Sequence, residues 1–187
     1  MKQSCKGFYE KQYLLENTRT EFYDKAIQYP TSLIIIFIGA ALYSNNRYFA
    51  ENEPQIFTRL DYFFVILFIL FSISIVVTIW YLYKVFHGFT RKYAYLPNTE
   101  VLFKYKETLY KHYYKYSNCL DYKTKRNDAL HNTVEEFGNI IGQYYINNTS
   151  FNQKINDRRA KYYSIMRTFL FIDLSLLTFI GAIGILN

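Results

Sequence analysis

The chain has 187 residues, of which 51% are hydrophobic and 21% aromatic, and its formal net charge at pH 7 is +7. The apolar residues gather in three blocks, with most of the charged residues between them. This segregation is typical of a membrane protein and argues against a soluble globule.

Residues 1–28 are expected to form an amphipathic helix on the cytoplasmic side of the membrane. Phe8, Leu15 and Phe22 recur there with charges between them, as one face of such a helix requires. Charges occur throughout the segment, and it contains no apolar h-region. It therefore does not resemble a cleavable signal peptide.

The first transmembrane helix is predicted at residues 29–46. Its strongly apolar part runs only from Leu33 to Tyr43, and uncharged flanks from Ala26 to Asn46 extend it to about the length of a crossing. Pro30 fits the start of a helix or a kink at the membrane edge.

Residues 47–61 are expected to form a short external loop, followed by a second transmembrane helix at residues 62–83. Those 22 residues carry no charge, and about 20 residues suffice for a helix to cross ~30 Å of hydrocarbon. Aromatic residues stand at both ends, among them Tyr62 and Trp80, and such residues favour the headgroup level.

Residues 84–165 are predicted to form a cytoplasmic helical region. Apolar and tyrosine side chains recur at helical spacing in two stripes, Leu102, Tyr105, Leu109, Tyr113 and Tyr116, and Leu130, Val134, Phe137, Ile141 and Tyr144. The pairs Glu100–Lys104 and Glu107–Lys111 have the favourable i,i+4 order. The polar letters "NNTS" at 147–150 predict a break, and a third helix is expected from near Phe151 into the last apolar block.

The third transmembrane helix is predicted at residues 166–187. Residues 1–27 hold five Lys and Arg, residues 44–61 hold two, and residues 84–167 hold fifteen. The positive-inside rule then places the N-terminus and the long region in the cytoplasm and the C-terminus outside. The expected fold is an all-α membrane protein with three transmembrane helices and a cytoplasmic helical bundle between the second and third.

Asp173 interrupts the third apolar block, and an ionised carboxylate inside a bilayer costs a few kcal/mol. Arg167 lies nearly opposite on the same helix, so the donor is expected from another span or another copy of the chain. Ser72, Ser74 and Thr78 are candidates. Asp173 is thus either a pore-lining or gating residue, or a structural hydrogen-bond acceptor that fixes helix packing.

Small residues mark another face of the same segment, where Ser175, Thr178 and Ala182 would permit close helix approach. Asp173 falls on roughly the opposite side. One face is therefore expected to pack while the other meets a lumen or another subunit, and ordinary packing within one protomer is the alternative. Ser175 and Thr178 join Asp173 as pore or gating candidates.

The basic, aromatic stretch at 103–116 is a candidate binding surface. Its cations are Lys104, Lys106, Lys111 and Lys115, and "NDRR" adds Arg158 and Arg159. These cations are expected to rest on anionic headgroups or to serve a structural role. Gripping phosphates of a nucleotide, with tyrosines stacked on bases, is the alternative, and nucleic acid is not an expected partner.

The sequence contains no pattern that indicates an enzyme. We find no Gly-rich phosphate loop, no nucleophile elbow and no HExxH motif, and the three histidines are scattered. Cys5 and Cys119 lie far apart and indicate neither a disulfide framework nor a metal motif. No catalytic residue, metal or cofactor is therefore expected.

The order of these segments resembles the small multi-span effectors of bacterial antiphage defence islands, in particular the SLATT type. Residues 8–27, the spans at 31–46 and 62–83, and the helices at 98–145 match that order, whereas the third span departs from the two-span layout. The resemblance implies an inner-membrane protein that oligomerises and forms a pore or disrupts the membrane on the signal of a soluble partner. The alternatives are a membrane scaffold subunit that docks a soluble cytoplasmic protein, and a membrane protein that senses a cyclic nucleotide.

Overall fold

The structure, a computed structural model, describes residues 3–51, 58–87, 93–119 and 121–186. Five helices occur in these ranges: α1 (Gln3–Ala26), α2 (Gln28–Glu51), α3 (Arg59–His87), α4 (Thr99–Tyr116) and α5 (Tyr122–Leu186). No strand is present in the described ranges, which confirms the prediction of an all-α protein. Most of the predicted external loop, residues 52–57, lies outside the described residues.

Three helical stretches are long enough and apolar enough to cross a membrane. They are Gly7–Phe49, which takes in most of α1 and α2, Arg59–His87, and Tyr122–Gly184. Their number agrees with the three predicted spans. Pro30 lies in the first turn of α2, where its missing N–H removes no helical hydrogen bond.

The chain divides into two compact units. The apolar unit comprises residues 20–91 and 156–187, and the polar unit comprises residues 1–19 and 92–155. Helix α5 contributes to both units without a break.

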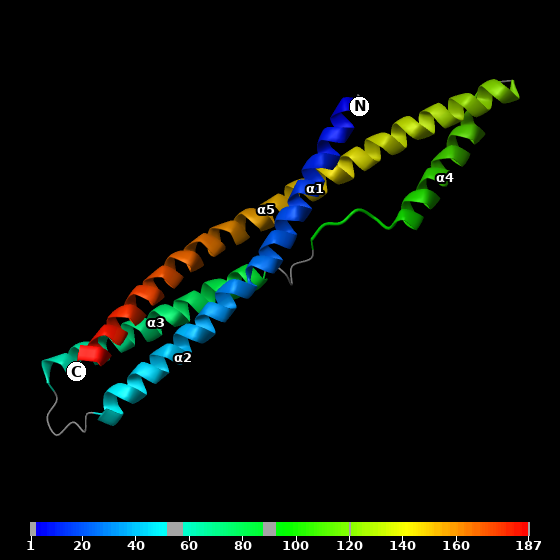
Figure 1. Ribbon diagram of the computed structural model, residues 1–187. Helices are drawn as coiled ribbons and strands as arrows, with labels where there is room; N and C mark the ends of the chain where they lie inside the picture. Colours follow the sequence, from blue (N-terminus) through cyan, green and yellow to red (C-terminus); the bar gives the residue numbers. More distant parts are fainter. Residues whose placement is uncertain (1–2, 52–57, 88–92, 120, 187) are drawn as a thin grey trace. The chain divides into compact units, whose positions relative to one another are not determined.

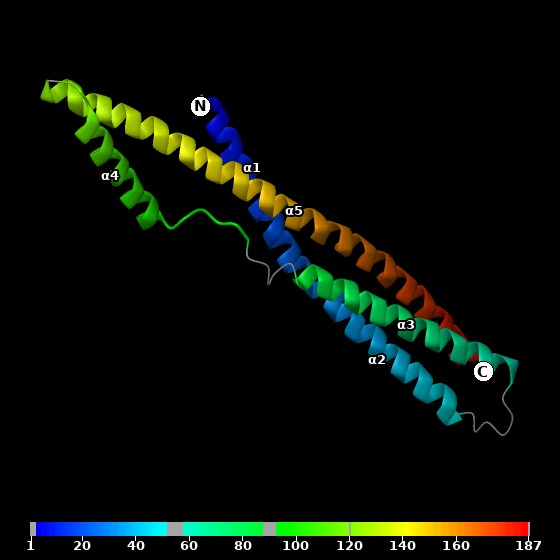
Figure 2. The ribbon, with the colours of Figure 1, turned by 180° about the vertical axis from the view of Figure 1, so that it is seen from behind.

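In the apolar unit, α2, α3 and the second half of α5 lie side by side (Figures 1 and 2). Helix α3 runs antiparallel to α5, because Thr78 contacts Asp173 whereas Val85, later in α3, contacts the earlier Arg159. The core is built from side chains that recur at steps of three and four: Ile34, Phe37 and Ala41 from α2, Phe64, Leu67, Phe71 and Ile75 from α3, and Met166, Leu170, Ile180 and Ile183 from α5. On α5, the buried Asp173 and the partly buried Leu177 fill the interval between Leu170 and Ile180.

Large apolar side chains also cover the outside of this unit. Ile35 on α2, Ile69 and Ile73 on α3, and Phe171 and Phe179 on α5 are all exposed. A helix that is apolar on all sides suits a membrane span or a large protein core. The composition of these helices therefore fits a lipid environment.

The far end of α2 is joined to the start of α3 by a polar cap. Thr58 and Asp61 form a capping box, in which the Thr58 N–H donates to Asp61 Oδ2 and the Thr58 hydroxyl lies 3.3 Å from the Asp61 N–H. The Tyr48 hydroxyl of α2 donates to Asp61 Oδ1, and its ring stacks on Phe64 with centroids 4.0 Å apart. The cap thus ties the two helices together at this end.

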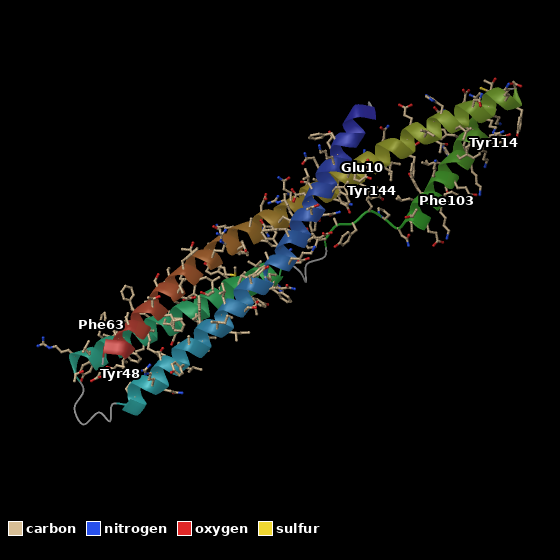
Figure 3. The ribbon with its side chains drawn as sticks, viewed as in Figure 1. Glu10, Tyr48, Phe63, Phe103, Tyr114 and Tyr144 are labelled. Atoms are coloured by element: carbon tan, nitrogen blue, oxygen red, sulfur yellow. The ribbon has the colours of Figure 1, made fainter. Side chains whose placement is uncertain are left out.

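The polar unit contains the first part of α1, all of α4 and the first half of α5. Asn152 of α5 holds the segment before α4 through two hydrogen bonds to Ala94. The Ala94 N–H donates to Asn152 Oδ1 at 3.0 Å, and Asn152 Nδ2 donates to the Ala94 carbonyl at 3.1 Å. The Tyr113 hydroxyl of α4 donates to Glu136 of α5, and Tyr13 of α1 packs on Tyr145. Figure 3 marks Phe103 near the start of α4 and Tyr114 near its end.

The predicted break at 147–150 is wrong, because α5 continues through it. Asparagine, threonine and serine each reduce helix stability by less than about 1 kcal/mol relative to alanine. Asn148, Asn152 and Asn156 recur at steps of four and are all buried, so packing of this face outweighs the local preference. The expected continuity of this helix with the last apolar block is confirmed.

Candidate functional site

Asp173 lies in the core stripe of α5 and is fully buried. Its Oδ2 atom is 2.7 Å from the hydroxyl of Thr78 on α3, which is also fully buried. The same hydroxyl lies 3.0 Å from the carbonyl oxygen of Ser74, one turn earlier in α3. Of the three donors predicted from the sequence, the structure therefore selects Thr78.

The other two predicted donors behave differently. Ser72 is exposed, and its hydroxyl donates to the Phe68 carbonyl of its own helix. Ser74 is buried beside Thr78, but neither its hydroxyl nor Asp173 Oδ1 has a hydrogen-bond partner among the described residues. A buried polar atom without a partner costs about 1–3 kcal/mol. Ser74, Thr78 and Asp173 therefore form a buried polar layer in which only part of the hydrogen-bonding capacity is used.

Ser175 and Thr178 do not join this layer. Both are exposed, and their hydroxyls donate to the carbonyls of Phe171 and Leu174 in their own helix. The sequence placed them opposite Asp173, which the structure supports. The sequence predicts that the face of Ser175 and Thr178 packs while Asp173 meets a lumen or another subunit. Within this chain the opposite holds, because the side that bears Asp173 packs on α3. That side also carries the large core residues Met166 and Leu170.

Arg159 is the second buried polar group of α5, with only 1% of its side chain exposed. Its Nε atom donates to the Val85 carbonyl at 3.1 Å, and Nη2 donates to Asp24 Oδ1 at 2.6 Å. The guanidinium also lies over the ring of Tyr23, 5.4 Å from its centroid. Arg159 thus links α1, α3 and α5 within the apolar unit.

The position of Arg159 has a simple electrostatic basis. Val85 is in the last turn of α3, where carbonyls lack helical partners and the helix dipole favours a cation. Thr20 supports the same junction, because its hydroxyl donates to Asn156 of α5 at 3.2 Å. Of the roles expected for these two arginines, the burial of Arg159 favours a structural one, whereas Arg158 is exposed.

The four lysines of α4 lie in the polar unit and differ in their surroundings. Lys104 pairs with Glu100 and Lys111 with Glu107, each at 2.7 Å, as the i,i+4 spacing predicted. Lys111 lowers the pKa of Glu107 through this hydrogen bond. Lys106 lies over the ring of Phe137, and Lys115 lies over that of Tyr116. Lys104, Lys111 and Lys115 are separated by steps of seven and four and therefore share one side of α4, whereas Lys106 lies on another side.

A hollow of about 410 Å³ lies between the end of α4 and the start of α5 in the polar unit. Its lining includes His112, His131, Cys119 and Asp128, and the Cys119 thiol donates to Asp128 at 3.0 Å. Over the described ranges, no three His, Cys, Asp or Glu side chains come close enough to hold a metal ion. None of the four α4 lysines lines this hollow.

The sequence reasoning missed the residues that bond Arg159 and cap α3. Asp24 is separated from Arg159 by 135 positions, and no local pattern distinguishes it from the other acids of the first segment. The Thr58–Asp61 capping box does have a sequence signature, a threonine followed three residues later by an acid. That signature lies within residues 47–61, the predicted external loop, whereas α3 begins at Arg59.

No protein-family model, curated protein or solved structure matches this chain.

Proposed function

We propose that this protein is a non-enzymatic, multi-pass protein of the bacterial inner membrane, with a cytoplasmic N-terminus and an external C-terminus. In this proposal α2, α3 and the second half of α5 cross the bilayer, and the polar unit forms a cytoplasmic helical bundle. The outward-facing apolar side chains on all three helices of the apolar unit support it, because water would penalise such a surface. The distribution of Lys and Arg supports the orientation.

We further propose that copies of the chain assemble in the membrane and breach it when a partner signals. The observation that carries this proposal is the partly satisfied Thr78–Asp173 contact on one side of α5 and the exposed Ser175, Thr178 and Ala182 on the other. Small exposed residues allow helices to approach closely in lipid. Asp173 would then hold α5 against α3 in the resting state and reach an aqueous path when that contact breaks.

Membrane potential after induced expression in bacteria tests this function. Thr78→Val and Asp173→Ala remove the contact and should increase the leak, measured as faster loss of a potential-sensitive dye signal. Asp173→Asn keeps an oxygen toward Thr78 and should lie between them and the wild type. Ser72→Ala is the matched control, because that hydroxyl bonds only its own helix. An unchanged potential in all variants and under every triggering condition would refute the pore.

A membrane scaffold that docks a soluble partner is the second candidate, and α4 favours it. Phe103, Tyr105 and Tyr116 are exposed on this helix, and each is next to a lysine in the sequence. Aromatic residues are enriched at protein interfaces. The scaffold predicts a stable complex that co-purifies with the full chain and weakens in Phe103→Ala with Tyr116→Ala. It also predicts no change of membrane potential in any variant, which separates it from the pore.

A further inference from the structure

A groove of about 290 Å³ lies on the apolar unit between the start of α2 and α5. Its walls are apolar, with Leu33 and Phe37 from α2 facing Leu170 and Leu174 from α5. Since Leu33 to Phe37 and Leu170 to Leu174 each span one helical turn, the walls are about 6 Å long in the direction of the helices.

One end of this groove is polar. Arg167 lines it together with Tyr29 and Tyr163. Arg167 is exposed, and no hydrogen bond or ion pair of its side chain is present among the described residues. It differs in this respect from the buried Arg159, whose guanidinium is fully engaged eight residues earlier.

In the proposed orientation, one end of the groove lies at the headgroup level of the membrane and the other end lies in the hydrocarbon. The apolar run of α2 begins at Leu33, and that of α5 begins just after Arg167. The proposed orientation therefore puts Arg167 and Tyr29 at the cytoplasmic headgroup level and Phe37 and Leu174 in the hydrocarbon. Aromatic and arginine side chains settle at that level.

A cation at the headgroup end of an apolar groove complements an amphiphile with a negative head. Guanidinium groups bind phosphate through paired, charge-assisted hydrogen bonds. An anionic phospholipid carries an uncompensated phosphate, whereas the ammonium group of a zwitterionic lipid competes with Arg167 for it. The exposed Arg158, earlier on α5, adds to the positive potential.

We propose that this groove binds one anionic phospholipid of the inner leaflet, with an acyl chain against Leu33, Phe37, Leu170 and Leu174 and the phosphate on Arg167. The inference rests on the proposed insertion of the chain into the inner membrane. It assigns Arg167 a ligand, whereas the structure gives Arg159 only protein partners.

The full chain is tested in nanodiscs of phosphatidylglycerol and phosphatidylcholine in equal amounts, followed by native mass spectrometry of the released protein. The wild type should retain one phosphatidylglycerol per chain in preference to phosphatidylcholine. Arg167→Gln should reduce that retention roughly tenfold, the effect of one lost charge-assisted interaction, and Arg167→Lys should restore part of it. Leu174→Trp, which fills a half-exposed part of the groove, should reduce retention of both lipids.

Lys161→Gln is the matched control, because this exposed cation on the same helix does not line the groove. Equal retention in Arg167→Gln and the wild type, an equal loss in Lys161→Gln, or a dimer that excludes lipid would overturn the inference. Alkaline carbonate extraction of the wild type from cells separates the two proposals. Release of the chain would refute membrane insertion itself, whereas an integral protein that retains no lipid would refute the groove alone.

Discussion

At the scale of single residues, the two adjacent arginines of α5 differ in burial. Arg159 is buried between Asp24 and Val85, and Arg158 faces solvent. Adjacent positions on a helix are turned by about 100°, so only one of the pair can face the core. The same residue type therefore has two roles at adjacent positions: Arg159 links helices inside the protein, and Arg158 is a surface charge.

Arg159→Gln should destabilise the protein by about 3 kcal/mol. The substitution leaves the Val85 carbonyl without its donor and the Asp24 carboxylate without its counterion, and removing one partner of a buried pair costs about 3–5 kcal/mol. The low end applies because Asp24 keeps 28% exposure. Thermal unfolding in detergent measures the change. Arg158→Gln is the control, expected within about 0.5 kcal/mol of the wild type, and equal shifts in both variants would contradict the assignment.

The coupling between Thr78 and Asp173 can be measured by a double-mutant cycle. Thr78→Val and Asp173→Ala, alone and combined, should show an interaction energy of about 0.5–2 kcal/mol, the range of hydrogen bonds between membrane helices. The same cycle with Thr178→Val should show none, because the Thr178 hydroxyl bonds its own helix. A similar coupling for both threonines would mean that the Thr78 contact has no special role.

How far these contacts were predictable depends on where the signal lies. A carboxylate in an apolar block demands a donor, and only a few polar residues in the second span can supply it, so Thr78 was among the predicted partners. The acid that pairs with Arg159 had no such restriction. The N-terminal segment contains several acids, and only the packing of α1 against α5 within the apolar unit selects Asp24.

At the scale of elements, the start of α5 is fixed by Asp121. Its Oδ2 atom accepts the Thr124 N–H and the Thr124 hydroxyl, both at 2.9 Å. The hydrogen bond from the Thr124 backbone is the main reason why the pKa of Asp121 is lowered. The helix therefore begins earlier than its apolar stripe, which starts at Leu130, because a side-chain cap and not a core contact sets the boundary.

The cap makes the first turn of α5 sensitive to acid. Because the folded pKa of Asp121 is lowered, its contribution is complete above the ordinary aspartate value near 4 and is lost as pH falls below it. Hydrogen exchange of peptides covering residues 117–130, corrected for intrinsic rates, should show protection at pH 6 that declines toward pH 3. Asp121→Asn caps without titrating, so its protection should change less. A parallel decline in both proteins would exclude the cap as the cause.

The long α5 helix shows the limit of local reasoning at this scale. The cap at its start and the apolar block at its end can both be recognised in the sequence. The ion pairs of α4 also form at the i,i+4 spacing that predicts them. The break predicted at 147–150 is wrong because Asn148 lies on a buried face of α5, and local residue preferences do not reveal that burial. A buried asparagine such as Asn152 acts here as a bridge to Ala94 and not as a helix breaker.

At the scale of the whole molecule, the directions of the three apolar helices restrict the possible topology. Helix α3 runs antiparallel to α5, as Thr78–Asp173 and Val85–Arg159 require. Helix α2 runs parallel to the second half of α5, as Figures 1 and 2 show. If all three cross the membrane, the two chain ends emerge on opposite sides.

Thiol labelling of intact cells tests which end of the chain faces the cytoplasm. Cys5 and Cys119 both belong to segments assigned to the cytoplasm, so the native protein should resist an impermeant maleimide until the cells are permeabilised. A cysteine appended after residue 187, in a Cys5→Ser, Cys119→Ser background, should react in intact cells. The proposed topology rests on the lysines and arginines, fifteen in residues 84–167 against two in residues 44–61, because moving such residues across a membrane is unfavourable. Labelling of Cys119 from outside would invert the topology, move Arg167 to the outer leaflet and remove the basis for a cytoplasmic signal.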